Sequence, residues 1–186
     1  MKKSLSFFLL FVSICVCAQP AGHSPADLLA WNEFYHLRWD DFRGQPGEDA
    51  IGDAGTAVQI KAKPFRIKNV VRYDVVALFN RRKSWSRDQS PALLDHERLH
   101  FDIAELYARK IRKRIAQLHE AGVNDVKTYN AEIEELLTES NEVDYQYDIE
   151  TLHGALSRQQ AEWSQKVKTG LKKLEQYRKA RYTVHS

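Results

Sequence analysis

"SPALLDHERLHFDIAELYARKIRKR", residues 90–114, is the stretch whose periodicity decides the fold. Serine followed by proline is typical of a helix N-cap and first turn, and Gly122 is the type of residue that ends a helix. Between these signals, apolar side chains recur on one face at helical spacing, at Leu93, Ile103, Tyr107, Ile111 and Leu118. The stretch therefore predicts an amphipathic helix from residue 91 to about residue 121, with one buried face.

Two histidines on the buried face indicate a metal site. His96 and His100 are four residues apart, which on a helix means about 40° of rotation and roughly 6 Å of rise, so both imidazoles can reach one ion. Glu97 lies about 100° further round, where it can contact a water molecule at the ion without being a ligand. Buried imidazoles need polar partners, and one ion satisfies both. We therefore predict zinc bound by His96 and His100, with Glu97 as the catalytic base.

Zinc needs a third protein ligand, and the segment "YQYDIETLHGALSRQQAEW", residues 145–163, offers candidates. We predict His153 as this ligand, because it lies among polar groups at the entrance to a helix. Asp148 and Glu150 remain rival ligands, since either carboxylate would suit zinc. Tyr147, in the same segment, is predicted to be a catalytic residue that donates a hydrogen bond to the oxyanion of the reaction.

Sheet and helix patterns occupy different halves of the chain. Alternating apolar residues in "AGTAVQIKAK", residues 54–63, and "YDVVALFNRRKSWS", residues 73–86, predict strands, of which 73–81 should offer an exposed edge to an extended peptide. Two further helical patterns run from Asp125 to Val143 and onward from Gly154. The chain is predicted to be α+β, with a small N-terminal antiparallel or mixed sheet packed on about three long helices.

The first residues are typical of a secretory signal peptide. Two lysines precede an apolar run that is too short for a comfortable membrane span, and Val16-Cys17-Ala18 resembles a cleavage site. We predict a signal peptide at 1–18, cleavage near Ala18–Gln19, and one domain over 19–186 that is secreted or periplasmic. A lipid anchor on Cys17 is the weaker alternative. Cleavage would remove both cysteines, so disulfides and cysteine chemistry are not expected.

Charge and hydropathy limit the kinds of molecule that the protein is expected to bind. Loss of Lys2 and Lys3 with the leader leaves 26 basic and 25 acidic residues, a balance that gives no reason to expect nucleic acid. The basic run "ARKIRKR", residues 108–114, is predicted to be a solvated helix face. No later apolar run could span a membrane. We expect a monomer that acts on a peptide or protein.

Four segments resemble, in order, the bacterial family catalogued as domain of unknown function 922. They are "LRWDDFRGQP" (37–46), "VVALFNRRKSW" (75–85), "LLDHERLHFDIAELYAR" (93–109) and "YDIETLHGALSRQQAEW" (147–163). The family is described as predicted secreted zinc-dependent proteases. The resemblance covers residues 37 to 175 and implies a zincin-type metallopeptidase, whose H-E-x-x-H motif corresponds to His96, Glu97 and His100.

The predicted function is hydrolysis of peptide bonds by a secreted or periplasmic zinc metallopeptidase, in which Glu97 activates the water at the zinc. Two alternatives stay open. One is an envelope binding module in which zinc is not catalytic. The other is a zinc amidase that acts on cell-wall cross-links.

Overall fold

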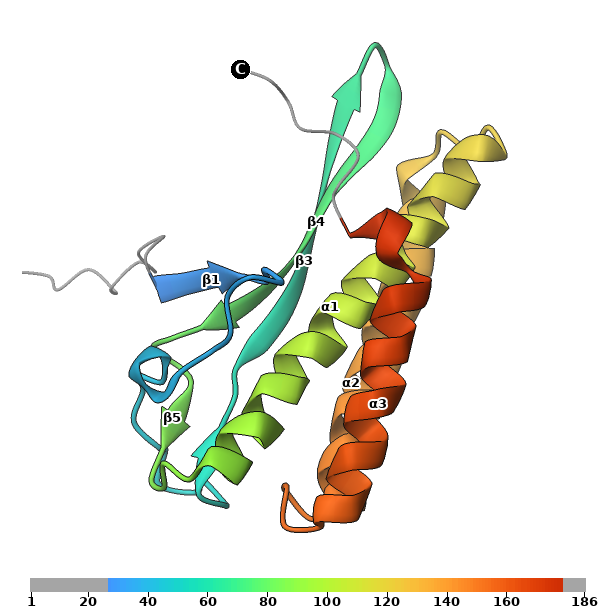
Figure 1. Cartoon of the computed structure of the whole chain (residues 1–186). Coiled ribbons are helices and arrows are strands. Elements are labelled where there is room, and N and C mark those ends of the chain that lie inside the picture. Colours follow the sequence, from blue (N-terminus) through green and yellow to red (C-terminus); the bar gives the residue numbers. More distant parts are fainter. Residues whose placement is uncertain (1–26, 179–186) are drawn as a thin grey trace, which may run out of the picture.

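The computed structural model describes residues 27–178, so the predicted signal peptide, its cleavage site and Cys17 lie outside the described residues. An N-terminal antiparallel sheet is followed by three helices, which confirms the predicted α+β class (Figure 1). The helices are α1 (Pro91–Glu120), α2 (Val126–Thr151) and α3 (Ser157–Lys173), followed by the 3-10 turn η3 (Glu175–Tyr177). α1 lies between the sheet and the pair formed by α2 and α3.

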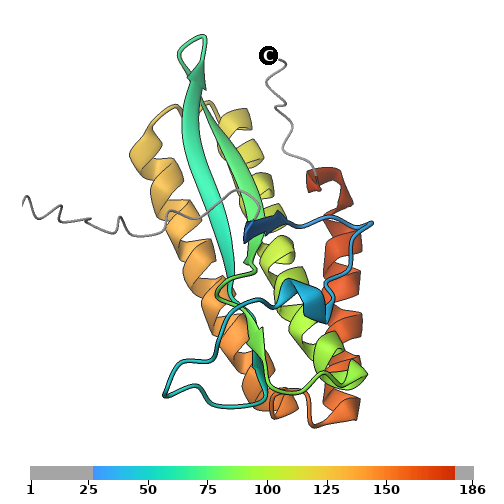
Figure 2. The ribbon, with the colours of Figure 1, turned by 90° about the vertical axis from the view of Figure 1, so that its left-hand side faces the viewer.

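The sheet is built on one long hairpin. β3 (Val58–Ile67) pairs antiparallel with β4 (Val70–Asn80), from Val58 opposite Phe79 to Ile67 opposite Val70. Lys68 and Asn69 turn the chain with φ values of 47° and 64°, as a two-residue hairpin of the primed type requires. The tip of this hairpin extends past the ends of the helices (Figure 2).

Two short strands complete the sheet structure. β1 (Leu28–Ala30) pairs with β4, and β2 (Ala54–Gly55) pairs with β5 (Trp85–Ser86) as a separate ribbon. The strand order β1-β4-β3 makes β4 the central strand. β1 covers β4 at Leu78–Asn80, so the prediction that residues 73–81 form an exposed edge is wrong for that part of the strand, and β3 is the edge strand near the helices.

α1 forms where the sequence predicts it. The Ser90 side chain accepts a hydrogen bond from the Leu93 amide, Pro91 is the first helical residue, and Gly122 follows the last turn with a φ of +75°. The sheet face of α1 packs on β4 through Phe101, Ala108 and Ile111. Its other face packs on α2 and α3, through Leu99, Ile103, Tyr107, Tyr147, Trp163 and Val167. Because α1 is covered on two sides, little of its surface is left for solvent.

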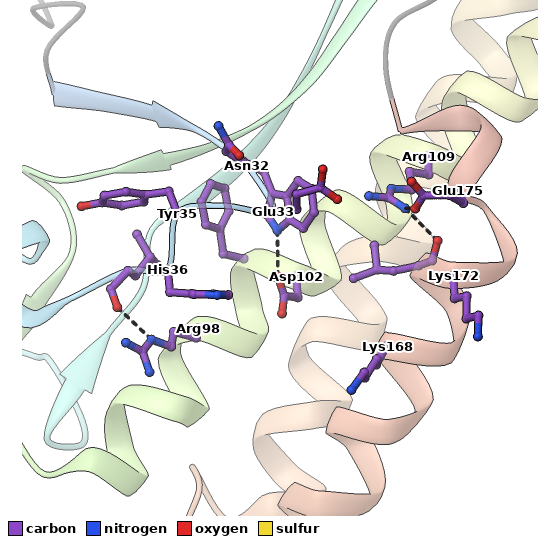
Figure 3. Close-up of a pocket in the computed structure, with 14 residues that line it drawn as sticks. Asn32, Glu33, Tyr35, His36, Arg98, Asp102, Arg109, Lys168, Lys172 and Glu175 are labelled. Atoms are coloured by element: carbon purple, nitrogen blue, oxygen red, sulfur yellow. Dashed lines mark hydrogen bonds and ion pairs between the residues drawn. The ribbon is translucent and has the colours of Figure 1, made fainter.

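That coverage buries charges that the sequence pattern assigns to solvent. Glu105 and Arg109 are each only 2 % exposed. Arg109 donates to Glu105, to the carbonyl of Leu171 and to Glu175, and Arg112 donates to Glu105 and to the carbonyl of Val75. The prediction that residues 108–114 form a solvated basic face fails for Arg109 and Arg112, because α3 and η3 cover them, whereas Lys113 is exposed as predicted. Figure 3 shows Arg109 and Glu175 together at this place.

Among the described residues, no helix combines the length and the apolar character that crossing a membrane requires.

Candidate metal centre

α1 and α2 bring three potential ligand atoms to one point. His96 and His100 project from successive turns of α1, and Asp148 projects from the last turn of α2. Nε2 of His96 and Nε2 of His100 are 3.3 Å apart, and they lie 3.1 Å and 3.2 Å from Oδ1 of Asp148. Because the three atoms all lie within 4.8 Å of one another, this group could hold a metal ion.

Hydrogen bonds fix the remaining ring nitrogen of each histidine. Nδ1 of His100 lies 2.7 Å from Oδ1 of Asp144, and Nδ1 of His96 lies 3.2 Å from Oε1 of Gln160. A carboxylate and an amide oxygen can only accept, so both Nδ1 atoms carry the hydrogen. Both Nε2 atoms then turn a lone pair toward Asp148. Three acceptors that face one another in a buried place need a cation or a proton between them.

Without an ion, a proton fulfils this role. Burial lowers the pKa of His100, but the hydrogen bonds and charges of Asp144 and Asp148 outweigh burial and raise that pKa to about 10. Burial raises the pKa of Asp148, but its polar contacts with His100 and His96 outweigh burial and hold this pKa well below its usual range. At neutral pH the cluster therefore holds a protonated imidazole between two carboxylates. A divalent cation can displace that proton.

Glu97 supplies an unpaired acceptor beside this group. Its side chain is buried, and its Oε2 has no hydrogen-bond partner among the residues that the structure describes. An unpaired buried carboxylate oxygen costs free energy, which folding alone does not explain. This oxygen could accept a proton from a group that enters the site, such as a water molecule bound to a metal ion. The donor set of two imidazoles and one carboxylate is one that zinc binds in catalytic sites.

The loop after α2 packs directly on His96. Gly154 has a φ of +84°, and a Cβ at this position would lie 2.9 Å from both Cβ and Cγ of His96. Glycine is needed here for the close approach as well as for the backbone angle. Leu152 and His153 also have positive φ values, 48° and 52°. The three residues in a row form a left-handed loop at the edge of the site.

The structure places His153 and Glu150 outside the group of three ligand atoms. The side chain of His153 is 65 % exposed, and its Nδ1 lies 3.5 Å from Oδ1 of Asp148. Glu150 accepts hydrogen bonds from Gln146 and Trp163 instead. Of the three residues weighed as third ligand from the sequence, Asp148 is the one that joins His96 and His100. Coordination by His153 stays a prediction, and the geometry favours Asp148.

Tyr147 lies behind the histidines. It is fully buried, its ring stacks on His96 with centroids 4.7 Å apart, and its hydroxyl donates to Oε1 of Gln160 at 2.7 Å. Burial is the first cause that raises the pKa of this hydroxyl, so it stays protonated. Tyr147 does not line the cleft, and this position suits a residue that orients Gln160 and His96 better than an oxyanion donor.

Two residues of the site, Asp144 and Gln160, were not predicted from the sequence. Asp144 could have been found, because Asp144 and Asp148 repeat on α2 the spacing of four residues that His96 and His100 show on α1. Gln160 carries no such signal. It lies in the first turn of α3, and only the packing of α3 against α1 brings it to His96.

The three ligand residues and Glu97 open into a cleft of about 390 Å³. One wall is the segment from Ile51 to Thr56 with Trp85, and the other contains Leu152, His153 and Ala155 from the loop after α2. Trp85 packs on Gly55, where a Cβ would lie 2.8 Å from its Nε1. The site is thus open to a ligand on one side and enclosed by packed side chains on the other.

A family model described as "bacterial protein of unknown function" (DUF922) matches residues 34–154, well over half of the chain. The matched range contains α1 and α2, and with them His96, Glu97, His100 and Asp148. No curated protein and no solved structure matches the chain. The family match agrees with the resemblance of the sequence motifs, and the chain belongs to the DUF922 family of bacterial proteins.

Proposed function

We propose that this protein is a zinc-dependent, zincin-like metallopeptidase that works outside the cytoplasm, either secreted or in the periplasm. The observation that carries the proposal is the meeting of three acceptor atoms, from His96, His100 and Asp148, next to the unpaired carboxylate oxygen of Glu97. A structural zinc site needs four protein ligands and no base, whereas a catalytic site keeps an open position. The apolar, lysine-led first 18 residues support the location.

Each residue of the site has a role that follows from its place. His96, His100 and Asp148 would hold the ion, and Asp144 and Gln160 fix the imidazole tautomers. Zinc bound there would polarise the carbonyl of the scissile bond and lower the pKa of the attacking water toward about 7. Glu97 takes the proton of that water and passes it to the amine that leaves when the C–N bond breaks. Tyr147 keeps Gln160 in position.

The free edge of β3 supports a peptide substrate. A second cavity, of about 170 Å³, lies between this strand and α2, and its lining shares Thr56, His100 and Asp144 with the metal cleft. The two cavities adjoin at these residues, and the second lies along residues 56–60. An extended peptide can hydrogen-bond to such an edge through its main chain. This edge takes the place of the one that the sequence assigned to residues 73–81.

The test combines metal analysis with hydrolysis of a peptide mixture. Purified protein, dialysed after exposure to zinc, should retain one zinc per chain and cleave the mixture. Glu97→Gln keeps the shape of the side chain but removes the base, so turnover should fall at least about 10²-fold with zinc content unchanged. Glu134→Gln makes the same chemical change on an exposed part of α2 and should leave turnover unchanged.

Equal cleavage by wild type and Glu97→Gln would refute the mechanism. A fully loaded wild type that cleaves nothing in the mixture would instead favour the non-catalytic binding module.

A further inference from the structure

Two exposed apolar side chains border the metal cleft from different sides. Ile51 is 88 % exposed and lies in the loop before β2, and Leu152 is 58 % exposed and lies in the loop after α2. Both line the cleft that contains His96 and Glu97. Single exposed apolar residues are common on proteins. Two of them, from different loops, line one candidate active site, and this is an arrangement that can bind an apolar group.

The backbone at Leu152 is a second and independent observation. Its φ of 48° and ψ of 54° place it in the left-handed region, where the Cβ of a leucine crowds the following carbonyl. Glycine or asparagine ends helices in this conformation at lower cost. The conformation is held by hydrogen bonds from the amides of Leu152 and His153 to carbonyls of α2, and by the packing of Gly154 on His96.

Leu152 is therefore unfavourable in two ways, because its backbone is in the left-handed region and its apolar side chain is exposed to solvent. Leu152 belongs to neither hydrophobic core cluster of the described residues. Strained residues of this kind cluster at ligand sites, where the surrounding structure holds them in place. The loop presents the apolar side chain at the rim of the cleft, next to the metal ligands.

We propose that Ile51 and Leu152 hold a bulky apolar side chain of the substrate, so that the site selects peptides with an apolar residue next to the cleaved bond. The proposal rests on the proposed peptidase function and names its substrate class. The rest of the cleft agrees with this class. Half-buried Leu93 and Trp85 extend the apolar wall, while the carboxylates of Asp53, Asp144 and Asp148 would repel an acidic side chain.

The test measures peptide binding without hydrolysis. Zinc-loaded Glu97→Gln protein is titrated with two blocked hexapeptides, Gly-Gly-Leu-Leu-Gly-Gly and Gly-Gly-Ser-Ser-Gly-Gly, by calorimetry. The leucine peptide should bind more tightly. Adding Leu152→Asn or Ile51→Asn should weaken its binding about tenfold or more, since each removes several apolar groups from the contact. Binding of the serine peptide should not change.

Ile149→Asn is the matched control. Ile149 is 52 % exposed on the same helix but does not line the cleft, so its replacement should leave binding of the leucine peptide unchanged. Asparagine tolerates the left-handed conformation, so Leu152→Asn should fold and melt up to about 4 °C higher than its parent. A melting point at or above that of the parent excludes misfolding as the cause of weaker binding.

The inference is overturned if Leu152→Asn binds the leucine peptide as tightly as its parent, or if neither peptide binds. It is also overturned if Ile149→Asn weakens binding as much as Leu152→Asn, because the contact would then lie on the outer face of α2. Absence of cleavage by the zinc-loaded wild type is a separate result. It would refute the peptidase while leaving the apolar selectivity of the cleft measurable.

Discussion

Two clusters of buried polar side chains lie on different faces of α1, and they differ in whether their groups satisfy one another. In the first, Glu105 accepts from Arg109 and Arg112, and carbonyls of β4 and α3 take further arginine hydrogens. In the second, His96, His100 and Asp148 turn acceptors toward one point, and Glu97 keeps an unpaired oxygen. The first cluster satisfies its own groups, whereas the second leaves acceptors that a cation or a proton could satisfy. Burial of polar side chains alone therefore does not mark a candidate ligand site, whereas buried acceptors that converge on one point do.

Breaking the first cluster, formed by Glu105, Arg109 and Arg112, should have the largest effect. Glu105→Ala leaves Arg109 as a buried charge without its nearest carboxylate, so the free energy of unfolding should fall by about 3–5 kcal/mol. Thermal unfolding followed by circular dichroism measures the loss, with Glu142→Ala on an exposed part of α2 as the control. A loss no larger than that of the control would show that Glu105 is not needed to balance the arginines.

Removing Asp148 should weaken the binding of zinc to the cluster formed by His96, His100 and Asp148. Asp148→Ala should weaken zinc binding by more than about 100-fold, beyond the range that outer-sphere partners reach. His153→Ala should change zinc affinity little, because His153 is mostly exposed and outside the group of three. Competition with a chromogenic chelator gives both affinities. The reverse ranking would return His153 to the ligand set.

Weakening the hydrogen bond between Asp144 and His100 should also lower zinc affinity, by a smaller amount. Asp144→Asn keeps an acceptor at Nδ1 of His100 but removes the carboxylate charge, so zinc affinity should fall about 10–100-fold. The same chelator competition measures it. Glu142→Gln, on the neighbouring turn, should leave the affinity as it is.

The smallest expected effect is the release of a proton when zinc binds. The pKa of His100 is raised from 6.5 to about 10, so its charged form stabilises the metal-free protein fully below pH 6.5, and that stability is lost as pH rises toward 10. Zinc binding at pH 7.5 should release about one proton. Calorimetry in buffers of different ionisation enthalpy detects it. A binding heat that is independent of the buffer would contradict the raised pKa.

The local signals of the sequence predicted the helices well. Ser90, Pro91 and Gly122 fix the ends of α1, and the apolar pattern fixes its buried face, because these depend on neighbouring residues. His96, Glu97 and His100 could be singled out for the same reason, since they lie within five consecutive residues of one helix. Their chemical role remains a proposal, but their proximity follows from the spacing.

What depends on long-range packing could not be predicted. The sequence does not show that β1 pairs with β4 and makes it central, or that α3 and η3 cover Arg109 and Arg112. Charged residues predict solvent unless their partners are known, and these partners are distant in the chain. The sequence could not decide among Asp148, Glu150 and His153 for the same reason, because the last turn of α2 and the left-handed loop determine which side chain meets α1.

The meeting of α1 and α2 at the ligand atoms has a further consequence for how the chain opens. Asp148 follows His100 by 48 residues, and the only two cysteines of the sequence are at positions 15 and 17. An ion held there would act as a cross-link of the kind that disulfides provide in many secreted proteins. The α2–α3 hairpin could then leave α1 only by breaking coordinate bonds, so amide exchange in α2 and cleavage by foreign proteases would follow the supply of metal. Chelation would loosen the hairpin first and leave the β3–β4 hairpin and its contacts with α1 in place.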